Sequence, residues 1–351
     1  MNILLLQVKR IGDLILTTPV IAALREKFPG ANLTLIVSRD GAPLLPAITG
    51  IDRSLVVQRK WSDLKIFRTI FRDQFEYCID FTGNDRSALL TCLSRAQKRI
   101  ASNWIRVQSK RRGLAYNEFV PDRVGDMHTV DFHLSLIEPL GIRNVSPEVR
   151  LDLPRSAREA AGLLLRQAGI DNGFVIFHPG SARAEKFWDA QRWADVIEHA
   201  RSVLKLKTVL TSGNSALEQR HVAEIKDRLS SVRGASPSDT ATRSIVDLSG
   251  QIDLLTLSAL IEQAQMIMTV DSAPMHLAAA TRTPQVVLFG PTNPFHWRPR
   301  ESPALILQGR STSPLVEFWP KQPRFSMNDI STEAVIDAMN ALLSAPAAQV
   351  S

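Results

Sequence analysis

Three polar loops contain the residues whose types and order are suited to chemistry. They are residues 10–13 (RIGD), residues 178–186 (HPGSARAEK) and residues 271–276 (DSAPMH). Each loop follows a short apolar run and precedes a helical pattern. Backbone N–H groups at the start of a helix, together with the helix dipole, favour anions such as phosphates. These three loops are therefore the candidate functional segments of the sequence.

The first loop presents a carboxylate, Asp13, beside Gly12. Gly12 permits a tight turn or the close approach of a ligand. Asp is common at helix starts, so Asp13 as a capping residue is the more ordinary interpretation. A carboxylate placed just after a first strand can also remove a proton from a hydroxyl group. Both roles remain open for Asp13.

The second and third loops favour a phosphorylated ligand. The second supplies backbone donors, the Ser181 hydroxyl and the Lys186 ammonium, a set suited to a diphosphate. In the third, Asp271 and Ser272 either cap a helix or hold a ligand at its N-terminus. With two such loops in one half and a lone carboxylate in the other, the pattern favours a nucleotide donor on the second half and an acceptor on the first.

Several common signatures are absent from the sequence. It contains no G-x-G-x-x-G followed by an acid, no Walker A sequence and no D-x-D pair. A dinucleotide dehydrogenase is therefore poorly supported. If the chain transfers a sugar, Lys186 and helix N-termini must neutralise the leaving group. We expect no cofactor and no metal.

The elements that carry these loops alternate between strand and helix, which predicts doubly wound parallel sheets. The pattern restarts after residue 150, so we expect two Rossmann-like domains, 1–155 and 156–351, facing each other across a cleft that binds ligand. The last helix completes the second domain or packs back on the first. The expected strands are residues 3–8, 33–37, 54–57, 76–80, 98–101, 174–178, 208–211, 245–248, 266–270 and 285–289. The expected helices are residues 14–28, 132–140, 154–168, 188–202, 218–229, 254–263 and 331–344, the last capped by Ser331.

Composition limits the class of protein and its partners. The chain has 351 residues, a formal net charge of +7 and only two cysteines. No apolar run is long enough to span a membrane, and the N-terminus lacks signal-peptide features, so we expect a cytoplasmic protein. The positive charge favours an anionic partner. Basic residues gather at 59–72 and 106–112, although most such clusters are only solvated faces, and no nucleic-acid motif accompanies them.

Four segments together resemble the bacterial lipopolysaccharide heptosyltransferases, glycosyltransferase family 9. They are RIGDLILTTPVIAALREKFP (10–29), HPGSARAEKFW (178–188), DLSG (247–250) and VDSAPMHLAAATRTPQVVLFGPTNP (270–294). They occur in the family's order, and the resemblance extends over nearly the whole chain. VDSAP, TSG at 211–213 and FHWRP at 295–299 are most similar to the branch that adds the third inner-core heptose. The resemblance implies a GT-B fold and an inverting, metal-independent transfer from ADP-heptose to an anionic lipopolysaccharide core acceptor.

The resemblance also implies roles for particular residues. Asp13 falls on the family's catalytic carboxylate and would be the general base. Lys186 falls on the lysine that contacts the donor phosphates. Ser181 falls on a donor-site hydroxyl position, but Ala182 stands where some members carry a second hydroxyl.

In the third loop, Asp271 falls on the acid that binds the heptose hydroxyls. Ser272 and Ala273 would present backbone N–H groups to the diphosphate, and the helix N-terminus that stabilises it extends to Met275. Many members have Gly where Ala273 stands, so the turn can differ here. His276 belongs to the same motif, but a helix residue bonded to a neighbouring loop is an equally good interpretation. The acceptor-side candidates are Arg10, Gly12, Lys60 and His128.

Three other functions remain open. One is a family 9 transferase that uses another nucleotide sugar. The second is a nucleotide-sugar-binding protein without catalysis, and the third is a nicotinamide-dependent oxidoreductase. Peripheral contact with the inner membrane also remains open, because the expected acceptor is lipid-linked.

Overall fold

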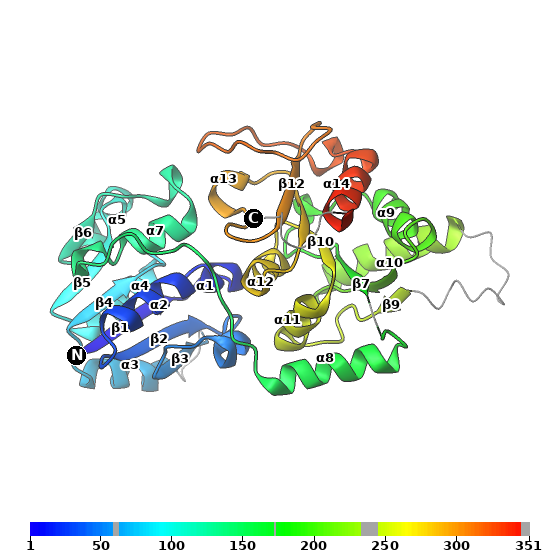
Figure 1. Cartoon of the computed structure of the whole chain (residues 1–351). Helices are drawn as coiled ribbons and strands as arrows, with labels where there is room; N and C mark the ends of the chain where they lie inside the picture. The colour runs from blue at the N-terminus through cyan, green and yellow to red at the C-terminus, as the bar shows by residue number, and fades with distance from the viewer. Residues whose placement is uncertain (59–62, 172, 233–244, 345–351) are drawn as a thin grey trace. The chain divides into compact units, whose positions relative to one another are not determined.

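The computed structural model describes residues 1–58, 63–171, 173–232 and 245–344. The chain forms two compact units, Met1–Asp152 and Leu153–Ser351. Each unit is built on one six-stranded, wholly parallel sheet (Figure 1). Parallel sheets need helices over both faces, and this is why their strands read as continuous apolar runs.

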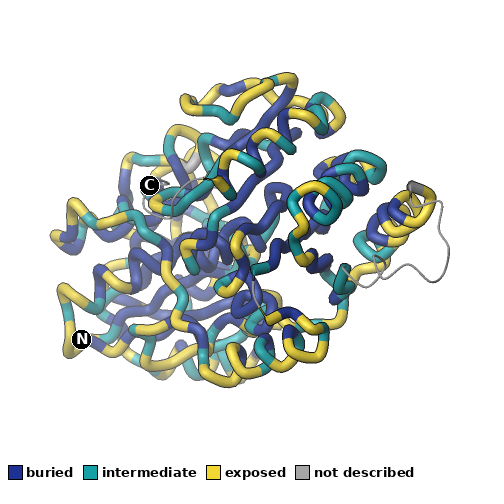
Figure 2. The backbone as a smooth tube through the Cα atoms, turned by 45° about the vertical axis from the view of Figure 1, so that its right-hand side comes forward, coloured by how far each residue is buried: buried dark blue, intermediate teal, exposed yellow. Residues whose placement is uncertain are grey.

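In the first unit the strands lie in the order β3-β2-β1-β4-β5-β6. Residues 3–6 of the central strand β1 have no exposed surface, and Figure 2 shows the buried strands in dark blue. The side chains of alternate residues point to opposite faces. Leu4 and Leu6 accordingly pack with Ile70 of α3 and Leu90 of α4 on one face. The strands are β1 Asn2–Gln7, β2 Asn32–Ser38, β3 Arg53–Val57, β4 Tyr77–Asp80, β5 Lys98–Ser102 and β6 Glu118–Val120.

The helices of the first unit follow the strands in sequence. They are α1 Ile11–Ile15, α2 Thr18–Lys27, α3 Asp63–Arg72, α4 Asp85–Ser94, α5 Trp104–Gln108, α6 Lys110–Gly113 and α7 Thr129–Ser135, with 3₁₀ turns η1 Ala42–Ala47, η2 Val124–Asp126 and η3 Glu138–Leu140. The acceptor-side candidate Lys60 lies outside the described residues.

Two single helices expected in this unit are interrupted. The pattern over residues 14–28 is divided into α1 and α2, and Pro19 lies in the first turn of α2. The pattern over residues 132–140 ends as α7 at Ser135, and a separate turn contains Pro139. Proline has no N–H and its ring clashes with the preceding turn, so it is accommodated where a helix begins.

In the second unit the strand order is β12-β11-β10-β7-β8-β9. Every residue of β7, β10 and β11 is buried. One face of the sheet packs against helices α9, α10 and α14 (Figure 1). On the other face, α12 contacts β10 and β11, and α11 packs on α8 and α12. The strands are β7 Phe174–His178, β8 Lys207–Leu210, β9 Ile245–Asp247, β10 Met266–Val270, β11 Gln285–Phe289 and β12 Ala304–Gln308.

The helices of the second unit include the last one predicted from the sequence. Ser331 accepts a hydrogen bond from the Ala334 N–H at 3.2 Å, which confirms it as the N-cap of α14. Val335 and Met339 of α14 lie in the core of this unit's sheet. No described helix is long and apolar enough to cross a membrane. The helices are α8 Arg155–Gln167, α9 Ala190–Ser202, α10 Ala216–Val232, α11 Leu254–Gln263, α12 Ala273–Thr281, α13 Pro294–Trp297 and α14 Thr332–Ser344, with 3₁₀ turns η4 Ala184–Lys186 and η6 Met327–Asp329.

Two fully buried tryptophans of this core offer a matched test of stability. Trp188 and Trp193 pack edge to face with ring centroids 5.6 Å apart. Trp188 Nε1 donates to the Ile330 carbonyl at 3.1 Å, whereas Trp193 Nε1 has no partner among the described residues. We expect Trp188→Phe to lower the free energy of unfolding by about 1 kcal/mol more than Trp193→Phe, because only Trp188 loses a hydrogen bond. Urea unfolding of both variants measures this difference, and an equal or reversed order would contradict it.

Candidate functional site

The loop after β1 holds Asp13 in the short helix α1. Two side chains fix the Asp13 backbone. Thr17 Oγ1 donates to the Asp13 carbonyl at 2.8 Å, and Gln7 Nε2 donates to the same carbonyl at 3.3 Å and to Thr17 Oγ1 at 3.0 Å. The N-cap position belongs to Arg10, whose side chain makes no capping bond. Asp13 therefore lies in the first turn of the helix, not at its cap.

Burial dominates the electrostatics of Asp13. The residue is 8% exposed, and loss of water raises the pKa of its carboxyl above the ordinary value of 3.8. Lys9, Arg10 and nearby backbone N–H groups act in the opposite direction and only partly offset burial. A carboxylate with a raised pKa is a stronger base than an ordinary Asp, which suits proton abstraction.

A second buried acid, Asp80, ends the neighbouring strand β4. Its oxygens accept hydrogen bonds from the Tyr116 hydroxyl at 2.6 Å and from the Thr82 and Gly83 N–H groups at 2.7 and 3.1 Å. These bonds tie the loop after β4 to α6 and the following segment. Because its lone pairs are already used by the protein, Asp80 is a structural acid, and Asp13 is the better candidate base at this edge.

The other acceptor-side candidates of this unit lie in different settings. Gly12 is inside the first turn of α1, so the left-handed turn that a glycine permits is not used there. His128 is 2% exposed and is the N-cap of α7, with Nδ1 accepting from the Val130 N–H at 3.2 Å. His128 thus has a capping role in the fold. Arg10 is exposed beside Asp13.

In the second unit the structure joins two predicted site residues directly. Lys186 Nζ donates to Asp271 Oδ2 at 2.6 Å and to the Asp271 carbonyl at 2.9 Å. The side chains are 11% and 9% exposed. Lys186 follows β7 and Asp271 follows β10, and these strands are neighbours in the sheet. The carboxyl ends of adjacent parallel strands meet at one edge, so residues 85 positions apart form one buried ion pair.

The N-terminus of α12 adjoins this pair. Ser272 is the N-cap but makes no side-chain capping bond, and Pro274 in the first turn has no N–H. Across the described residues, no acceptor is assigned to the N–H groups of Ser272 and Ala273. Two such donors together with the helix dipole favour the binding of an anion.

Met275 lies in the first turn of α12. Its side chain is fully buried with Val287, Phe289 and Ile306, and its N–H donates to the Ser272 carbonyl at 3.2 Å. The apolar side chains of a helix on a sheet point toward the sheet. Met275 therefore contributes to a donor site only as part of the helix N-terminus.

His276 lies close to the ion pair, and Ser181 belongs to the same loop after β7 as Lys186. His276 is 5% exposed, and burial lowers its pKa to about 4, so the imidazole is neutral at pH 7. Among the described residues its Nδ1 has no hydrogen-bond partner. Ser181 is also buried, and its hydroxyl accepts from the Arg183 N–H at 3.4 Å.

Two further polar groups at this edge were not predicted from the sequence. Thr292, which follows the neighbouring strand β11, donates its hydroxyl to Asp271 Oδ2 at 2.5 Å. Glu218, at the start of α10, accepts from the Gly213 N–H at 3.2 Å. A Cβ at Gly180 or Gly213 would clash with the Glu218 carboxylate, so both glycines are needed for it to reach the loops after β7 and β8. The strand ends at 289 and 210 were the only sequence signals for these positions.

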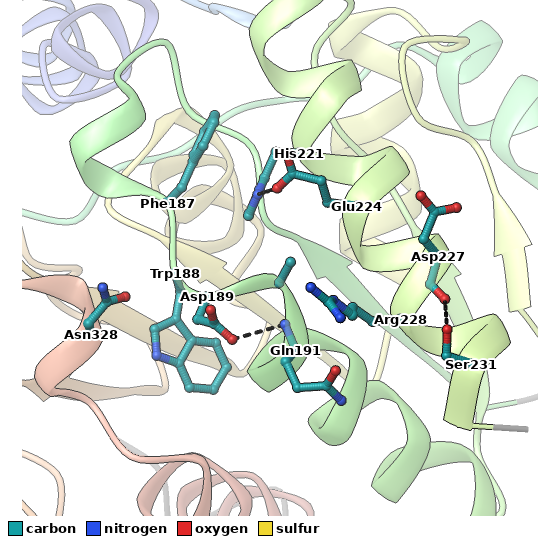
Figure 3. A pocket seen from close by; sticks show the side chains of 11 residues that line it. Phe187, Trp188, Asp189, Gln191, His221, Glu224, Asp227, Arg228, Ser231 and Asn328 are labelled. Carbon is teal, nitrogen blue, oxygen red and sulfur yellow. Dashed lines mark hydrogen bonds and ion pairs between the residues drawn. The ribbon is translucent and has the colours of Figure 1, made fainter.

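Two cavities of the second unit differ in their relation to the Lys186–Asp271 pair. One, of about 300 Å³, includes Thr292 in its lining and so adjoins Asp271. The other, of about 510 Å³, contains none of the predicted site residues, and the Phe187 ring stacks on His221 at 4.3 Å there (Figure 3). Charged groups that line this larger cavity are Asp189, Glu224, Asp227 and Arg228. The smaller cavity shares Thr292 with the Asp271 carboxylate, whereas the larger one includes none of the predicted site residues, so the smaller cavity is the one relevant to chemistry.

Comparison with known proteins agrees with this arrangement. The sequence model of glycosyltransferase family 9 (heptosyltransferase) matches residues 64–318, which include the whole site of the second unit but not Asp13. Lipopolysaccharide heptosyltransferase 3 of Escherichia coli strain K12 is 28% identical over 316 residues, covering 88% of this chain and 85% of the relative.

Solved structures show the same fold. The crystal structure of a family 9 glycosyl transferase from Veillonella parvula superposes with a TM-score of 0.80 at 24% identity, covering 97% of each chain. The E. coli heptosyltransferase WaaC with ADP has a TM-score of 0.69 at 17% identity and the same coverage. The expected α/β GT-B fold is confirmed. Because the family model matches well over half of its length, the chain belongs to glycosyltransferase family 9, the heptosyltransferase family.

Proposed function

We propose that this glycosyltransferase moves heptose from ADP-heptose to the lipopolysaccharide inner core, with inversion and without a metal. The observation that carries the proposal is the buried Lys186–Asp271 pair beside the open N-terminus of α12. The similarity to lipopolysaccharide heptosyltransferase 3 and to a heptosyltransferase crystallised with ADP supports the choice of acceptor class and donor. The first unit binds the acceptor and the second binds the donor.

The donor site is built around Asp271. Lys186 and Thr292 both bond its Oδ2, and within the described residues no donor is assigned to Oδ1. Oδ1 accepts from a heptose hydroxyl, while the Ser272 and Ala273 N–H groups bind the diphosphate. Ser181 adds a hydroxyl at the end of the neighbouring strand. The Lys186 ammonium shares its charge between Asp271 and the leaving group.

The chemical step is a single displacement. Asp13 accepts the proton of the acceptor hydroxyl as that oxygen attacks the anomeric carbon of the heptose. The bond from this carbon to the ADP oxygen breaks, and ADP leaves with its charge stabilised by Lys186 and the α12 N-terminus. One base suffices, because attack from the face opposite to ADP inverts the anomeric centre without a covalent intermediate.

Two other candidate functions share parts of the site. A family 9 transferase specific for another nucleotide sugar would use the same Lys186 and α12 N-terminus. A nucleotide-sugar-binding protein without catalysis would have no use for a buried Asp13 with a raised pKa. A nicotinamide-dependent oxidoreductase lacks support in the sequence, since no dinucleotide fingerprint is present.

Asp13→Asn tests the catalytic role. We expect turnover to fall by about 10²–10⁴, the usual contribution of a general base, while ADP affinity stays within twofold. Turnover is measured from initial rates with ADP-heptose and a truncated core acceptor in the presence of EDTA. ADP affinity is measured by calorimetry. Unchanged turnover, or loss of ADP binding together with turnover, would contradict the assignment.

The same variant has a predictable stability. Because burial raises the pKa of Asp13, the folded protein keeps this proton to higher pH than the unfolded chain does. The ionised carboxylate therefore lowers the free energy of unfolding once the pH exceeds 3.8. We expect the melting temperature of Asp13→Asn at pH 7 to equal or exceed that of wild type. A lower melting temperature would indicate a structural role.

Lys186→Met tests the donor site while keeping the length of the side chain. Charge-assisted hydrogen bonds are worth about 1.5–3 kcal/mol, so ADP affinity should fall by about 10–100-fold. Lys207→Met is the matched control, since Lys207 is exposed at the first residue of β8, opposite the site edge. Calorimetric titration with ADP compares the two folded variants. Equal affinity in Lys186→Met and wild type would remove Lys186 from the donor site.

Peripheral contact with the inner membrane is part of the proposal. On α5 and after α6, Trp104, Val107 and Leu114 are 38%, 65% and 83% exposed beside the exposed cations Lys110 and Arg111. Exposed apolar and basic side chains together favour an anionic lipid surface. We expect phosphatidylglycerol vesicles, but not phosphatidylcholine vesicles, to sediment the protein, and V107E/L114E to abolish this. Sedimentation that V107E/L114E leaves unchanged would contradict the contact.

A further inference from the structure

The smaller cavity of the second unit begins at the Lys186–Asp271 pair. Thr292 belongs to both, since it lines the cavity and donates to Asp271 Oδ2 at 2.5 Å. The wall opposite is held in place by Asn293, whose Nδ2 donates to the Trp319 and Pro320 carbonyls at 3.1 and 2.9 Å. A group bound in this cavity of about 300 Å³ would therefore lie one side chain away from Asp271.

The lining of the cavity is cationic. Arg183, Lys321 and Arg324 contribute to it, and none of its lining residues is Asp or Glu. Arg183 is bonded to Glu185, with Nε to Oε1 at 2.7 Å, whereas Lys321 and Arg324 are exposed at the rim. A concave surface whose charged side chains are all cationic attracts anions.

Gln322 adds a buried acceptor that the protein leaves unused. It is 6% exposed and lines the cavity. Gln308 Nε2 donates to the Gly290 and Thr292 carbonyls, which leaves Gln308 Oε1 to accept from Gln322 Nε2 at 2.8 Å. This chain of bonds fixes the Gln322 amide, and its Oε1 has no donor among the described residues. A buried acceptor without a donor costs about 1–3 kcal/mol, so a bound hydroxyl that donates to it would be stabilised.

From these groups we infer that the cavity binds an acidic sugar of the acceptor, one that carries a phosphate or a carboxylate. The Trp297 ring, which lines the cavity, offers an apolar face for a sugar ring, Gln322 Oε1 accepts from a sugar hydroxyl, and Lys321 and Arg324 bind the acidic group. The inference rests on the proposed function, because it names the acceptor chemistry that the donor-binding unit itself recognises.

The donor does not account for these cations. In the proposed donor site, Lys186 and the α12 N-terminus already neutralise the diphosphate, and Asp271 takes the transferred sugar. ADP-heptose has no other acidic group. The positive charges of Lys321 and Arg324 are therefore available to bind an acidic group of the second substrate, the acceptor.

The test uses the whole protein saturated with ADP, so that the donor site is filled. Mannose 6-phosphate, galacturonate and mannose are titrated as probes by calorimetry. We expect both acidic sugars, or the one whose acid matches the acceptor, to bind at least tenfold more tightly than mannose. In K321E/R324E this preference should disappear while ADP affinity is retained. The matched control K205E/K207E makes the same change of charge on exposed lysines of the same unit and should keep the preference.

Each outcome separates the inference from the proposed function. Absence of ADP binding in wild type contradicts the proposed function. If ADP binds but neither acidic sugar exceeds mannose, or if K321E/R324E and K205E/K207E lose the preference equally, the inference is wrong. Loss of ADP affinity in K321E/R324E alone would assign the cavity to the donor and also overturn it. A raised KM for an acidic core acceptor in K321E/R324E, with the KM for ADP-heptose unchanged, would support it.

Discussion

The pairing of β7 with β10 is the constraint on which the second unit depends. It brings the ends of two strands that are far apart in the sequence to one edge, where Lys186 and Asp271 form a buried ion pair. Burying two charges costs several kcal/mol for each ion unless further bonds compensate. The Asp271 carbonyl and the Thr292 hydroxyl supply such bonds here. Despite its desolvation cost, the ion pair holds polar groups at the position where a diphosphate would bind.

Three buried carboxylates, Asp271, Asp80 and Asp13, differ in the partners that the protein gives them. Asp271 is neutralised by Lys186, and Asp80 is held by three donors, so both help to hold their loops in place. Burial raises the pKa of both Asp80 and Asp13, but among the described residues no side-chain donor bonds the Asp13 carboxyl. A group that costs stability in this way is characteristic of functional positions. In the proposed mechanism the loss of stability at Asp13 accompanies a gain in basicity, because a stronger base removes the acceptor proton more readily.

Much of this fold follows from apolar patterning. The strands 174–178, 266–270 and 285–289 match β7, β10 and β11, because strands buried on both faces are continuous apolar runs between polar loops. The edge strands β6 and β12 were missed. β6 has only three residues and begins with Glu118, and the apolar run of β12 lies in a segment to which no strand was assigned. Where a helix divides around a proline, as it does near Pro19 and Pro139, depends on tertiary packing.

The site was predictable to the level of loops but not of contacts. The sequence indicated Lys186 and Asp271 as site residues, yet only the strand order shows that they bond each other. The burial of the Met275 side chain was not foreseen, because a motif does not reveal which side chains of its helix face the core. Thr292, Trp297 and Gln322 were missed because the segment from 291 to 324 has little periodicity, and its cavity is formed by loops that meet only in three dimensions.

The most direct test of the central claim is calorimetric titration of the wild-type protein with ADP, GDP and UDP, in EDTA and again with magnesium. The account predicts tight binding of ADP alone, with the same affinity in both conditions, because the chain's own Lys186 and α12 N-terminus neutralise the diphosphate. Preference for GDP or UDP would contradict the assigned donor, and binding that requires magnesium would contradict the metal-independent site. Failure to bind any of the three nucleotides would contradict the proposed transfer itself.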